Sequence, residues 1–410
     1  MSKIGEIHLS SETFKNMHNL RLLKFYGSYH PFGYFANKPK LYFNQGLEYL
    51  SDELRYLFWA GYPLKTLPLR FSPEKLFEIS LPFSNIEKLW TGTKPAFKLK
   101  SIELYYSQHL IEIPDVSEAP NIEIINLAGC TNLVEVPSSI QYLNDLRILK
   151  LNGCKSLRNF PSNIHFKSLV TLDLASCINI TEFPQISGNL RDLELGGTSI
   201  EEVPSSIACL TELCLLSLTR CSKLKSISTS ICKLKSLQKL SLSMCAKLES
   251  FPEILEKMEC LEFLWLNGAT EIKELPSSIE NLNGLQVLEL ADCKNLETIP
   301  SSIKKLTSLA ILDLSGCTKL GKLPELSALC SLKDLDLSFC NLTKIPEEIC
   351  CISSLDTLTL DGNNFESLPS RIKQLSRLTF LSLNNCSMLK SVPELPSCLR
   401  ELNALHCKWL

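Results

Sequence analysis

Residues 146–161 read LRILKLNGCKSLRNFP, and residues 122–137, one copy earlier, read IEIINLAGCTNLVEVP. Both fit the template L-x-x-L-x-L-x-x-C-x-x-L-x-x-L-P, which recurs along the chain. The first Leu or Ile of each copy falls at positions 20, 54, 76, 99, 122, 146, 169, 190, 213, 237, 261, 285, 309, 332, 355, 378 and 399. From 54 onward the steps are 21 to 24 residues. Such a period predicts a solenoid whose stacked copies share one core.

Each template position has a physical reason. The L-x-L segment predicts a short strand whose leucines point into the core while the x residues point to the opposite, concave face. A small, weakly polar Cys fits a buried position that still meets backbone groups. The Leu-Pro pair turns the chain to the convex side. Ser-Ser after Pro, as in residues 276–279, is expected to cap a short helical turn.

The expected fold class is therefore an α/β repeat of the leucine-rich-repeat type. This is a curved horseshoe solenoid with a parallel concave β-sheet and short helical or irregular convex segments. We expect residues 1–53 to hold a lead-in, the first repeat and an aromatic-rich insertion, with Tyr29, Phe32, Tyr34, Phe35, Tyr42 and Phe43. Leucine-rich repeats follow over 54–398, and 399–410 begin an incomplete last repeat. Because no polar capping repeat closes the pattern, the sequence favours an excerpt of a longer protein.

The composition narrows the function classes. The 410 residues carry 42 basic and 44 acidic side chains, a net charge of -2, which argues against nucleic acid as a partner. No apolar run is long enough to predict a membrane span. The start of the chain lacks the apolar segment of a secretory signal, so the 18 cysteines indicate reduced thiols in the cytosol or nucleus.

The cysteines are predicted to be structural. One template position holds nine of them, each about one repeat from the next: Cys130, Cys154, Cys177, Cys221, Cys245, Cys293, Cys317, Cys340 and Cys386. Zinc sites need close cysteine pairs instead. Cys350 and Cys351, and the group Cys398, His406 and Cys407, are the remaining candidates, but nothing nearby completes a metal shell. We expect no metal.

Catalysis finds no support in the sequence. The six histidines are scattered without a partner pattern around a Ser or Cys nucleophile. No G-x-x-x-x-G-K-[ST] motif occurs, and residues 196–198 are a variant of the repeat rather than a phosphate-binding loop. The prediction is a protein without enzyme activity and without a cofactor.

The surface carries the functional hypothesis. The central concave column is predicted to run Lys24, Phe58, Ser80, Glu103, Asn126, Lys150, Asp173, Glu194, Ser217, Ser241, Trp265, Glu289, Asp313, Asp336, Thr359, Ser382 and Asn403. Phe263 and Trp265 share one face of one strand, and aromatic residues on a polar sheet are typical binding anchors. The acidic run Glu289, Asp313 and Asp336, joined by Asp292 and Asp334, suggests a basic partner. The alternative is a solvated face with isolated aromatic residues.

A second aromatic group lies nearer the N-terminus and has another interpretation. It contains Tyr56, Phe58, Tyr105 and Tyr106. Here packing under the insertion at residues 27–52 is the alternative to a binding surface.

Several segments resemble the leucine-rich-repeat region of plant intracellular immune receptors, in the branch that carries a Toll/interleukin-receptor domain and a nucleotide-binding domain. They are FKNMHNLRLLKFY at 14–26, GLEYLSDELRYLFWAGYPLKTLP at 46–68, LPFSNIEKLW at 81–90, IPDVSEAPN at 113–121, and VPSSI at 136–140 and 203–207. The resemblance implies recognition of pathogen effectors or of host proteins changed by them. It also implies contact with the receptor's own nucleotide-binding domain, which holds a switch inactive.

Three hypotheses follow. The first is a protein-recognition module of a plant immune receptor, with Phe263, Trp265, Glu289, Asp313 and Asp336 as the protein-binding residues. The second is a free-standing leucine-rich-repeat scaffold or decoy without a receptor switch. The third, a repeat-bearing ubiquitin ligase, needs a catalytic domain that the sequence lacks.

Overall fold

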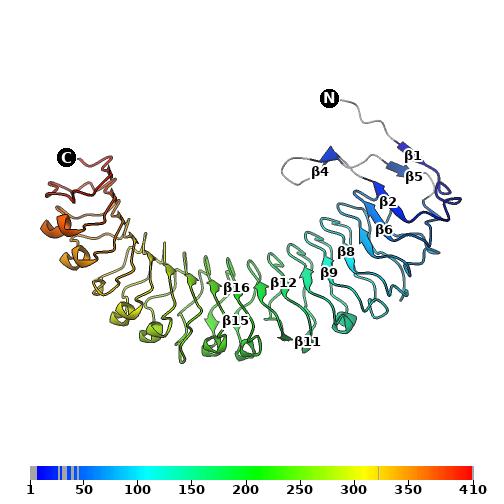
Figure 1. Cartoon of the computed structure of the whole chain (residues 1–410), viewed down its shortest axis with the longest axis horizontal. Helices are drawn as coiled ribbons and strands as arrows, with labels where there is room; N and C mark the ends of the chain where they lie inside the picture. Colours follow the sequence, from blue (N-terminus) through cyan, green and yellow to red (C-terminus); the bar gives the residue numbers. More distant parts are fainter. Residues whose placement is uncertain are drawn as a thin grey trace. The chain divides into compact units, whose positions relative to one another are not determined.

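The computed structural model describes residues 7–25, 28–29, 35–37, 41–43, 46–321 and 323–408. It divides into two compact units, unit 1 at Met1–Ser199 and unit 2 at Ile200–Leu410. Figure 1 shows that each unit is a stack of coils with its main strands along the inner side and short helical turns along the outer side. The predicted leucine-rich-repeat fold class is confirmed.

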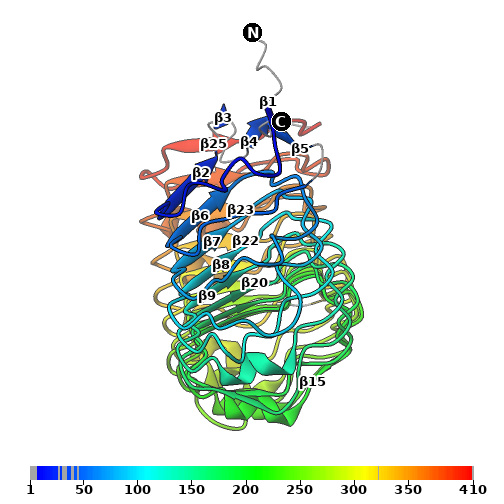
Figure 2. The same ribbon diagram turned by 90° about the vertical axis from the view of Figure 1, so that its right-hand side faces the viewer.

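The described residues of unit 1 form strands and one 3-10 helix. They are β1 (Ile7–Leu9), β2 (Leu22–Phe25), β3 (Ser28–Tyr29), β4 (Phe35–Asn37), β5 (Leu41–Phe43), β6 (Tyr56–Trp59), β7 (Glu78–Ser80), β8 (Ser101–Glu103), β9 (Ile124–Asn126), η1 (Ser138–Tyr142), β10 (Ile148–Lys150), β11 (Ile164–Phe166), β12 (Thr171–Asp173), β13 (Ile186–Gly188) and β14 (Asp192–Glu194). The main sheet runs β2-β6-β7-β8-β9-β10-β12-β14, all parallel. Figure 2 shows β2 and β6 to β9 stacked in chain order.

Unit 2 follows the same plan with more helical turns. Its elements are β15 (Glu202–Val203), η2 (Ser205–Cys209), β16 (Leu215–Ser217), β17 (Ser226–Ile227), η3 (Thr229–Lys233), β18 (Lys239–Ser241), β19 (Phe263–Trp265), η4 (Ser277–Asn281), β20 (Val287–Glu289), η5 (Ser301–Lys305), β21 (Ile311–Asp313), β22 (Asp334–Asp336), η6 (Glu347–Cys351), β23 (Thr357–Thr359), η7 (Ser370–Gln374), β24 (Phe380–Ser382) and β25 (Glu401–Asn403). Its main sheet runs β16-β18-β19-β20-β21-β22-β23-β24-β25, again all parallel.

The core comes from the middle residue of each strand. Leu149 pairs with Ile125 on one side and Leu172 on the other, and all three are fully buried. The strand pleat sends their neighbours, such as Lys150, to the opposite face. Burying one such side chain contributes about 2 kcal/mol, and each layer can be buried only because the next one covers it.

Aromatic residues fill the first layers of unit 1. Trp59 is fully buried, with ring centroids of Phe25 at 4.3 Å and Tyr62 at 5.1 Å. Phe14 from the lead-in and Phe43 from the insertion contact the same ring at 6.2 and 5.9 Å. Part of the insertion therefore closes the core. The side chains of Tyr29, Phe32, Tyr34 and Phe35, also predicted for this insertion, lie outside the described residues.

The repeated cysteine position is buried, as predicted. The nine cysteines are at most 1% exposed. Thiols such as those of Cys154 and Cys317 donate a hydrogen bond to a carbonyl of the preceding coil, at 3.2 Å in both cases. Burial raises the pKa of Cys130 and Cys293 to about 12, which keeps these thiols protonated. All 18 cysteines are free thiols in the structure.

The convex turns correct one expectation. Helical turns do follow Pro137, Pro204, Pro276 and Pro300, but none of these four has a side-chain cap. The prediction that the following serines cap the turn is wrong, because proline itself occupies the capping position and the serines lie inside the helix. The second serine can instead bind the preceding coil. The Ser278 hydroxyl accepts a 2.9 Å hydrogen bond from the Ile254 amide.

The residue just before the Cys position adopts a left-handed backbone, and we call this series the left-handed ridge. Its members with positive φ are Gly61, Phe83, Tyr106, Gly129, Gly153, Ser176, Gly197, Arg220, Met244, Gly268, Asp292, Gly316, Phe339, Gly362, Asn385 and His406. Bulky residues rarely take this conformation. Several ridge glycines lie against a large ridge side chain of the preceding coil. A Cβ at Gly362 would overlap the Phe339 ring, and one at Gly268 would lie 2.6 Å from the Met244 sulfur.

Candidate protein-recognition surface

Two rows of side chains cross the concave face of unit 2. Strand pairing in register places Trp265, Glu289, Asp313, Asp336, Thr359, Ser382 and Asn403 in one row, which we call the central row. The same pairing places Phe263, Val287, Ile311, Asp334, Thr357, Phe380 and Glu401 in the adjacent first row. All five binding residues predicted from the sequence therefore come together on β19 to β22.

The aromatic pair is ordered and partly exposed. The rings of Phe263 and Trp265 stack with centroids 5.5 Å apart and planes 19° from parallel. The Lys239 ammonium lies 5.6 Å from the centre of the Phe263 ring, within the range of a cation–π contact. Both rings are half-buried. This arrangement gives unit 2 a rigid apolar contact area next to polar strands.

The acidic residues of the central row are oriented by local hydrogen bonds. Asp313 accepts from the Ser315 amide and Asp336 from the Ser338 amide, both at 2.8 Å. The Glu289 carboxylate accepts a 2.6 Å hydrogen bond from the Asn267 side chain. Each contact engages one carboxylate oxygen and holds the charge on the open face of the sheet.

Burial and mutual repulsion act on these carboxylates. The pKa of Asp336 lies above the usual 3.8, because the group is partly buried and Asp313 and Asp361 repel its charge, although hydrogen bonds from Ser338 oppose the shift. The pKa of Asp334 is raised in the same way, by burial and then by Asp336, Asp313 and Asp356. Among the described residues no ion pair includes Asp313, Asp334 or Asp336. No ion pair among the described residues therefore neutralises this acidic run directly, and the Lys239 ammonium on the same face lies against the Phe263 ring.

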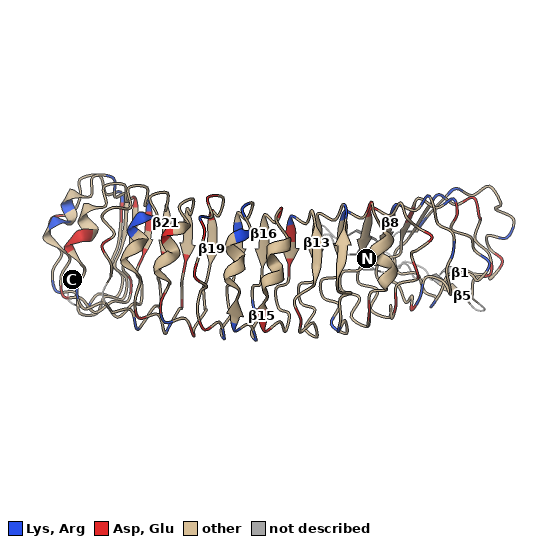
Figure 3. Ribbon diagram, turned by 90° about the horizontal axis from the view of Figure 1, so that it is seen from below, with Lys and Arg blue, Asp and Glu red and all other residues tan. Residues whose placement is uncertain are grey.

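Most ion pairs of unit 2 lie elsewhere. Lys225 pairs with Glu201 and Lys235 with Glu256, at 2.7 and 2.8 Å, and each joins neighbouring coils away from the concave rows. Figure 3 looks onto the helical turns and shows both charge signs scattered there. The like-charged run of the central row is thus a local departure from a mixed surface.

Sequence reasoning from the central column missed the apolar part of the first row. Val287 is 8% exposed and Ile311 is 37% exposed, and both continue the row that begins at Phe263. The sequence template already indicates these positions, because each first-row residue stands two positions before the central-row residue of the same copy. Asp361 was missed as well. It accepts hydrogen bonds from the Ser382 hydroxyl at 2.6 Å and the Asn384 amide at 2.7 Å.

The concave face of unit 1 has a different charge pattern. Lys150 pairs in register with Asp173. Burial raises the pKa of Asp173 and of Glu103, and in both cases Lys150 opposes the shift. In unit 1, Lys150 therefore offsets the negative charge of the acidic residues in the same row.

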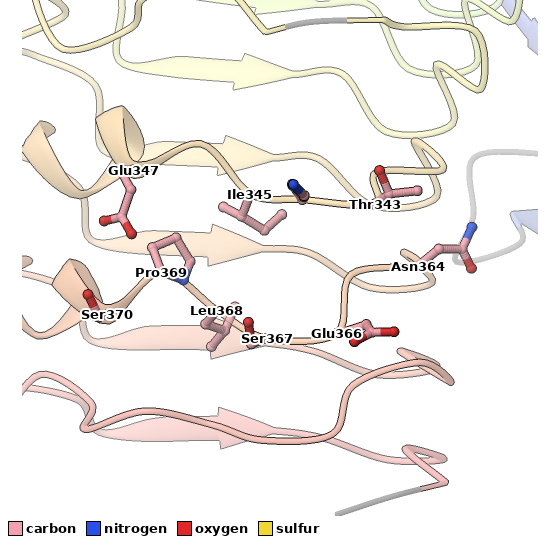
Figure 4. A pocket seen from close by; sticks show the side chains of 10 residues that line it. Thr343, Ile345, Glu347, Asn364, Glu366, Ser367, Leu368, Pro369 and Ser370 are labelled. Carbon is pink, nitrogen blue, oxygen red and sulfur yellow. The ribbon is translucent and has the colours of Figure 1, made fainter.

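A groove opens on the flank of unit 2, beside the coils that hold β22 and β23. It has a volume of about 840 Å³, and Figure 4 shows Ile345, Glu347, Glu366 and Leu368 among its lining residues. The lining mixes polar and apolar groups, and the Glu366 carboxylate is engaged by Lys390 at 2.8 Å. No catalytic arrangement is visible among these residues.

Two of the remaining metal candidates, Cys398 and Cys407, contact the backbone. Cys398 donates to the carbonyl oxygens of Leu375 and Leu378, and Cys407 donates to that of Leu383 at 3.1 Å. Within the described ranges no group of three or more His, Cys, Asp or Glu residues could hold a metal ion. In the same part of the chain, no helix combines the length and apolar character that crossing a bilayer requires.

Two family models match the chain. Residues 233–410 match the leucine-rich repeats of RPS4B-like disease resistance proteins, and residues 75–94 match a leucine-rich-repeat model. A solved leucine-rich-repeat protein of Leptospira interrogans has a TM-score of 0.56 at 24% identity, covering 83% of this chain and 81% of that one. The structural match concerns the fold alone.

Three similar proteins come from Arabidopsis thaliana. Disease resistance protein RPP2A is 43% identical over 219 residues, 53% of this chain and 16% of the relative. Disease resistance-like protein DSC1 is 42% identical over 55% of this chain and 18% of the relative, and disease resistance protein RPS4B is 39% identical over 54% and 17%. The match thus spans less than a fifth of each relative. It confirms the resemblance to the leucine-rich repeats of plant disease resistance proteins.

Proposed function

We propose, from repeats that match those of plant disease resistance proteins, that this chain is the recognition module of an intracellular immune receptor. It senses pathogen effectors or host proteins that they have modified, and it restrains the receptor's nucleotide switch. The module works in the cytoplasm, with the nucleus as the alternative location. Its partners are proteins, not nucleic acids.

One observation carries this proposal. A stacked aromatic pair, Phe263 and Trp265, stands half-exposed on the concave face of a solenoid. Large aromatic side chains at the centre of a contact surface supply much of the free energy of protein binding. The groove of Figure 4 offers no comparable anchor. The proposed activity is therefore binding rather than catalysis.

The test uses the intact receptor that contains this chain. A double variant with Phe263→Ala and Trp265→Ala is expected to lose the cell-death response to the matching pathogen, because the anchors of the contact are gone. Tyr142→Ala is the matched control, since Tyr142 is 57% exposed on the helical turn η1. Protein levels of all variants are compared by immunoblot.

The outcomes separate the hypotheses. A normal response together with normal partner binding in the double variant, at normal protein level, would show that the concave anchors are not used. Lost partner binding with an unchanged response would favour the scaffold or decoy role. Loss of both, with Tyr142→Ala unaffected, supports the recognition module.

A further inference from the structure

We infer that the concave face of β19 to β22 receives a basic amphipathic α-helix of the partner protein. This inference rests on the proposed function, because it specifies the shape and charge of what the recognition surface binds. Three observations carry it. The two rows differ in chemistry, the strand spacing is close to the pitch of a helix, and among the described residues no ion pair includes Asp313, Asp334 or Asp336.

The two rows demand two kinds of side chain from the partner. Phe263 and Ile311 present apolar surface in the first row on β19 and β21, and Val287 between them is apolar and 8% exposed. Glu289, Asp313 and Asp336 make the central row acidic on β20, β21 and β22, so the two sets share β20 and β21. A partner that presents one apolar stripe beside one cationic stripe satisfies both rows at once.

The spacing of the strands favours a helix. Neighbouring strands are about 4.8 Å apart, and an α-helix advances about 5.4 Å per turn. Helix side chains at i, i+4 and i+7 span about 10.5 Å and can therefore follow the row over two strand intervals of about 9.6 Å, a mismatch of only about 1 Å. An extended segment advances about 6.6 Å between side chains on the same face, so it loses register after about two strands.

The electrostatics favour a cationic stripe. Glu289 and Asp336 are the in-register neighbours of Asp313, and Asp334 lies two residues before Asp336 on β22. Repulsion among these carboxylates contributes to raising the pKa of Asp336 and Asp334, after burial. Lysine or arginine side chains placed over the row would remove that repulsion. An acidic partner would add to it.

Replacing a central-row aspartate by asparagine tests the role of its negative charge without disturbing the turn that follows the strand. In unit 1, Asn126 occupies the central row, and its side-chain oxygen accepts a 3.2 Å hydrogen bond from the Ala128 amide. Asp313 and Asp336 make the same turn with Ser315 and Ser338. Asp313→Asn and Asp336→Asn therefore keep the turn and remove only the negative charge.

The experiment measures peptide binding to the 410-residue chain by fluorescence anisotropy. The probe is a synthetic basic amphipathic helix with leucines at i, i+4 and i+7 and a parallel stripe of lysines. The first control peptide has the same residues in permuted order, and the second has glutamate in place of lysine. We expect the helix to bind about tenfold more tightly than either control at low salt, and less tightly as salt rises.

Chain variants complete the test. The double variant Asp313→Asn, Asp336→Asn is expected to bind the basic helix about tenfold more weakly. Asp173→Asn in unit 1 is the matched control, because Asp173 makes the same turn with Ala175, and it should leave binding unchanged. Thermal unfolding of each variant shows that the fold is kept.

Three results would overturn the inference: equal binding of the permuted peptide, equal binding of the glutamate peptide, or no effect of the asparagine pair. Each is distinct from a failure of the proposed function. If the peptides fail while Phe263→Ala and Trp265→Ala still abolish the receptor response, the surface recognises protein but not a basic helix.

Discussion

Units 1 and 2 repeat the same core under different surfaces. Ile125 and Leu149 in unit 1 and Leu288 and Leu312 in unit 2 occupy the same buried strand position. On the concave face, however, Lys150 sits beside Asp173 in unit 1, whereas Asp313 in unit 2 has only acidic neighbours in its row. The core therefore explains why both units fold, and the surface rows distinguish what each can bind.

The largest expected contrast concerns thiol reactivity. The cysteines of unit 1 are Cys130, Cys154 and Cys177, all buried. Unit 2 contains the exposed cysteines Cys209, Cys260, Cys330 and Cys351. A pKa raised by about three units lowers the thiolate fraction about 1000-fold at neutral pH, and burial adds steric protection. Mass spectrometry after brief alkylation of the native chain should find label on the exposed cysteines of unit 2 and none on unit 1.

Alkylation after unfolding in guanidinium is the control, since all 18 cysteines should then react. Labelling of Cys130 as fast as Cys260 in the native chain would contradict the buried cysteine ladder of unit 1.

The next contrast concerns partner binding. Trp265→Ala in unit 2 is expected to weaken binding of the protein partner by about 2 kcal/mol, roughly 30-fold, because it removes a half-buried anchor. Phe58→Ala changes an aromatic residue in the equivalent strand position of unit 1 and should alter binding less than threefold, within about 0.6 kcal/mol. Surface plasmon resonance with the purified partner compares the two. Equal losses would contradict the assignment of recognition to unit 2.

A smaller contrast concerns the left-handed ridge. Gly362 in unit 2 has a φ of +64° and a Cβ added there would overlap the Phe339 ring, whereas Gly197 in unit 1 has a φ of +73° and a Cβ added there would approach nothing closer than Ser176 at 3.6 Å. Gly197→Ala should cost about 1 kcal/mol of unfolding free energy, from backbone strain alone. Gly362→Ala should cost about 2 kcal/mol, because the ring must also move.

Denaturant unfolding monitored by circular dichroism measures both costs. Adding Phe339→Ala to Gly362→Ala should recover the difference between the two glycine variants. If the ring is not the cause, this second change will recover nothing.

The smallest contrast concerns charge and pH. The pKa of Asp336 is raised in the folded chain, so its ionised form destabilises the fold once the pH exceeds that pKa. Asp336→Asn should therefore stabilise the chain at pH 7 by about 0.5 kcal/mol, after allowance for solvent screening. The gain should vanish below about pH 4, where the aspartate is protonated. Asp173→Asn should gain less, because Lys150 already stabilises the Asp173 charge.

Melting temperatures at pH 7 and pH 3.5 are the measurement. A gain from Asp336→Asn that persists at the lower pH would show that repulsion and burial of the charge are not its source.

Local patterns made much of the fold predictable. The L-x-L spacing placed every strand of the main sheets, because alternation in a strand depends only on sequence position. The nine repeated cysteines could be assigned to the core because they occupy one fixed position of the repeat template. The five predicted binding residues were brought to one face because parallel strands stack in register, although their role in binding still awaits the tests above.

Features that depend on contacts between coils were not predictable from the template. Ser-Ser after Pro276 suggested a helix cap, but Ser278 binds the neighbouring coil instead. The partnership of Gly362 with Phe339 joins residues 23 positions apart and is visible only once the coils are stacked. The apolar first row was overlooked because Val287 and Ile311 resemble core residues when they are judged by residue type.

The left-handed ridge matches certain neighbouring repeats to each other. Tyr106 is followed by Gly129, Met244 by Gly268, Asp292 by Gly316 and Phe339 by Gly362, so a large side chain meets a glycine in the next coil. Deleting residues 340–362 would keep the repeat length but would bring Phe339 against Asn385. At these four junctions neighbouring copies are matched to each other by contacts that are independent of the binding residues, whereas elsewhere on the ridge large residues follow one another, as Phe83 and Tyr106 do. Exchanging both copies of such a pair keeps the match, whereas replacing the glycine copy alone by one with a large ridge residue removes it.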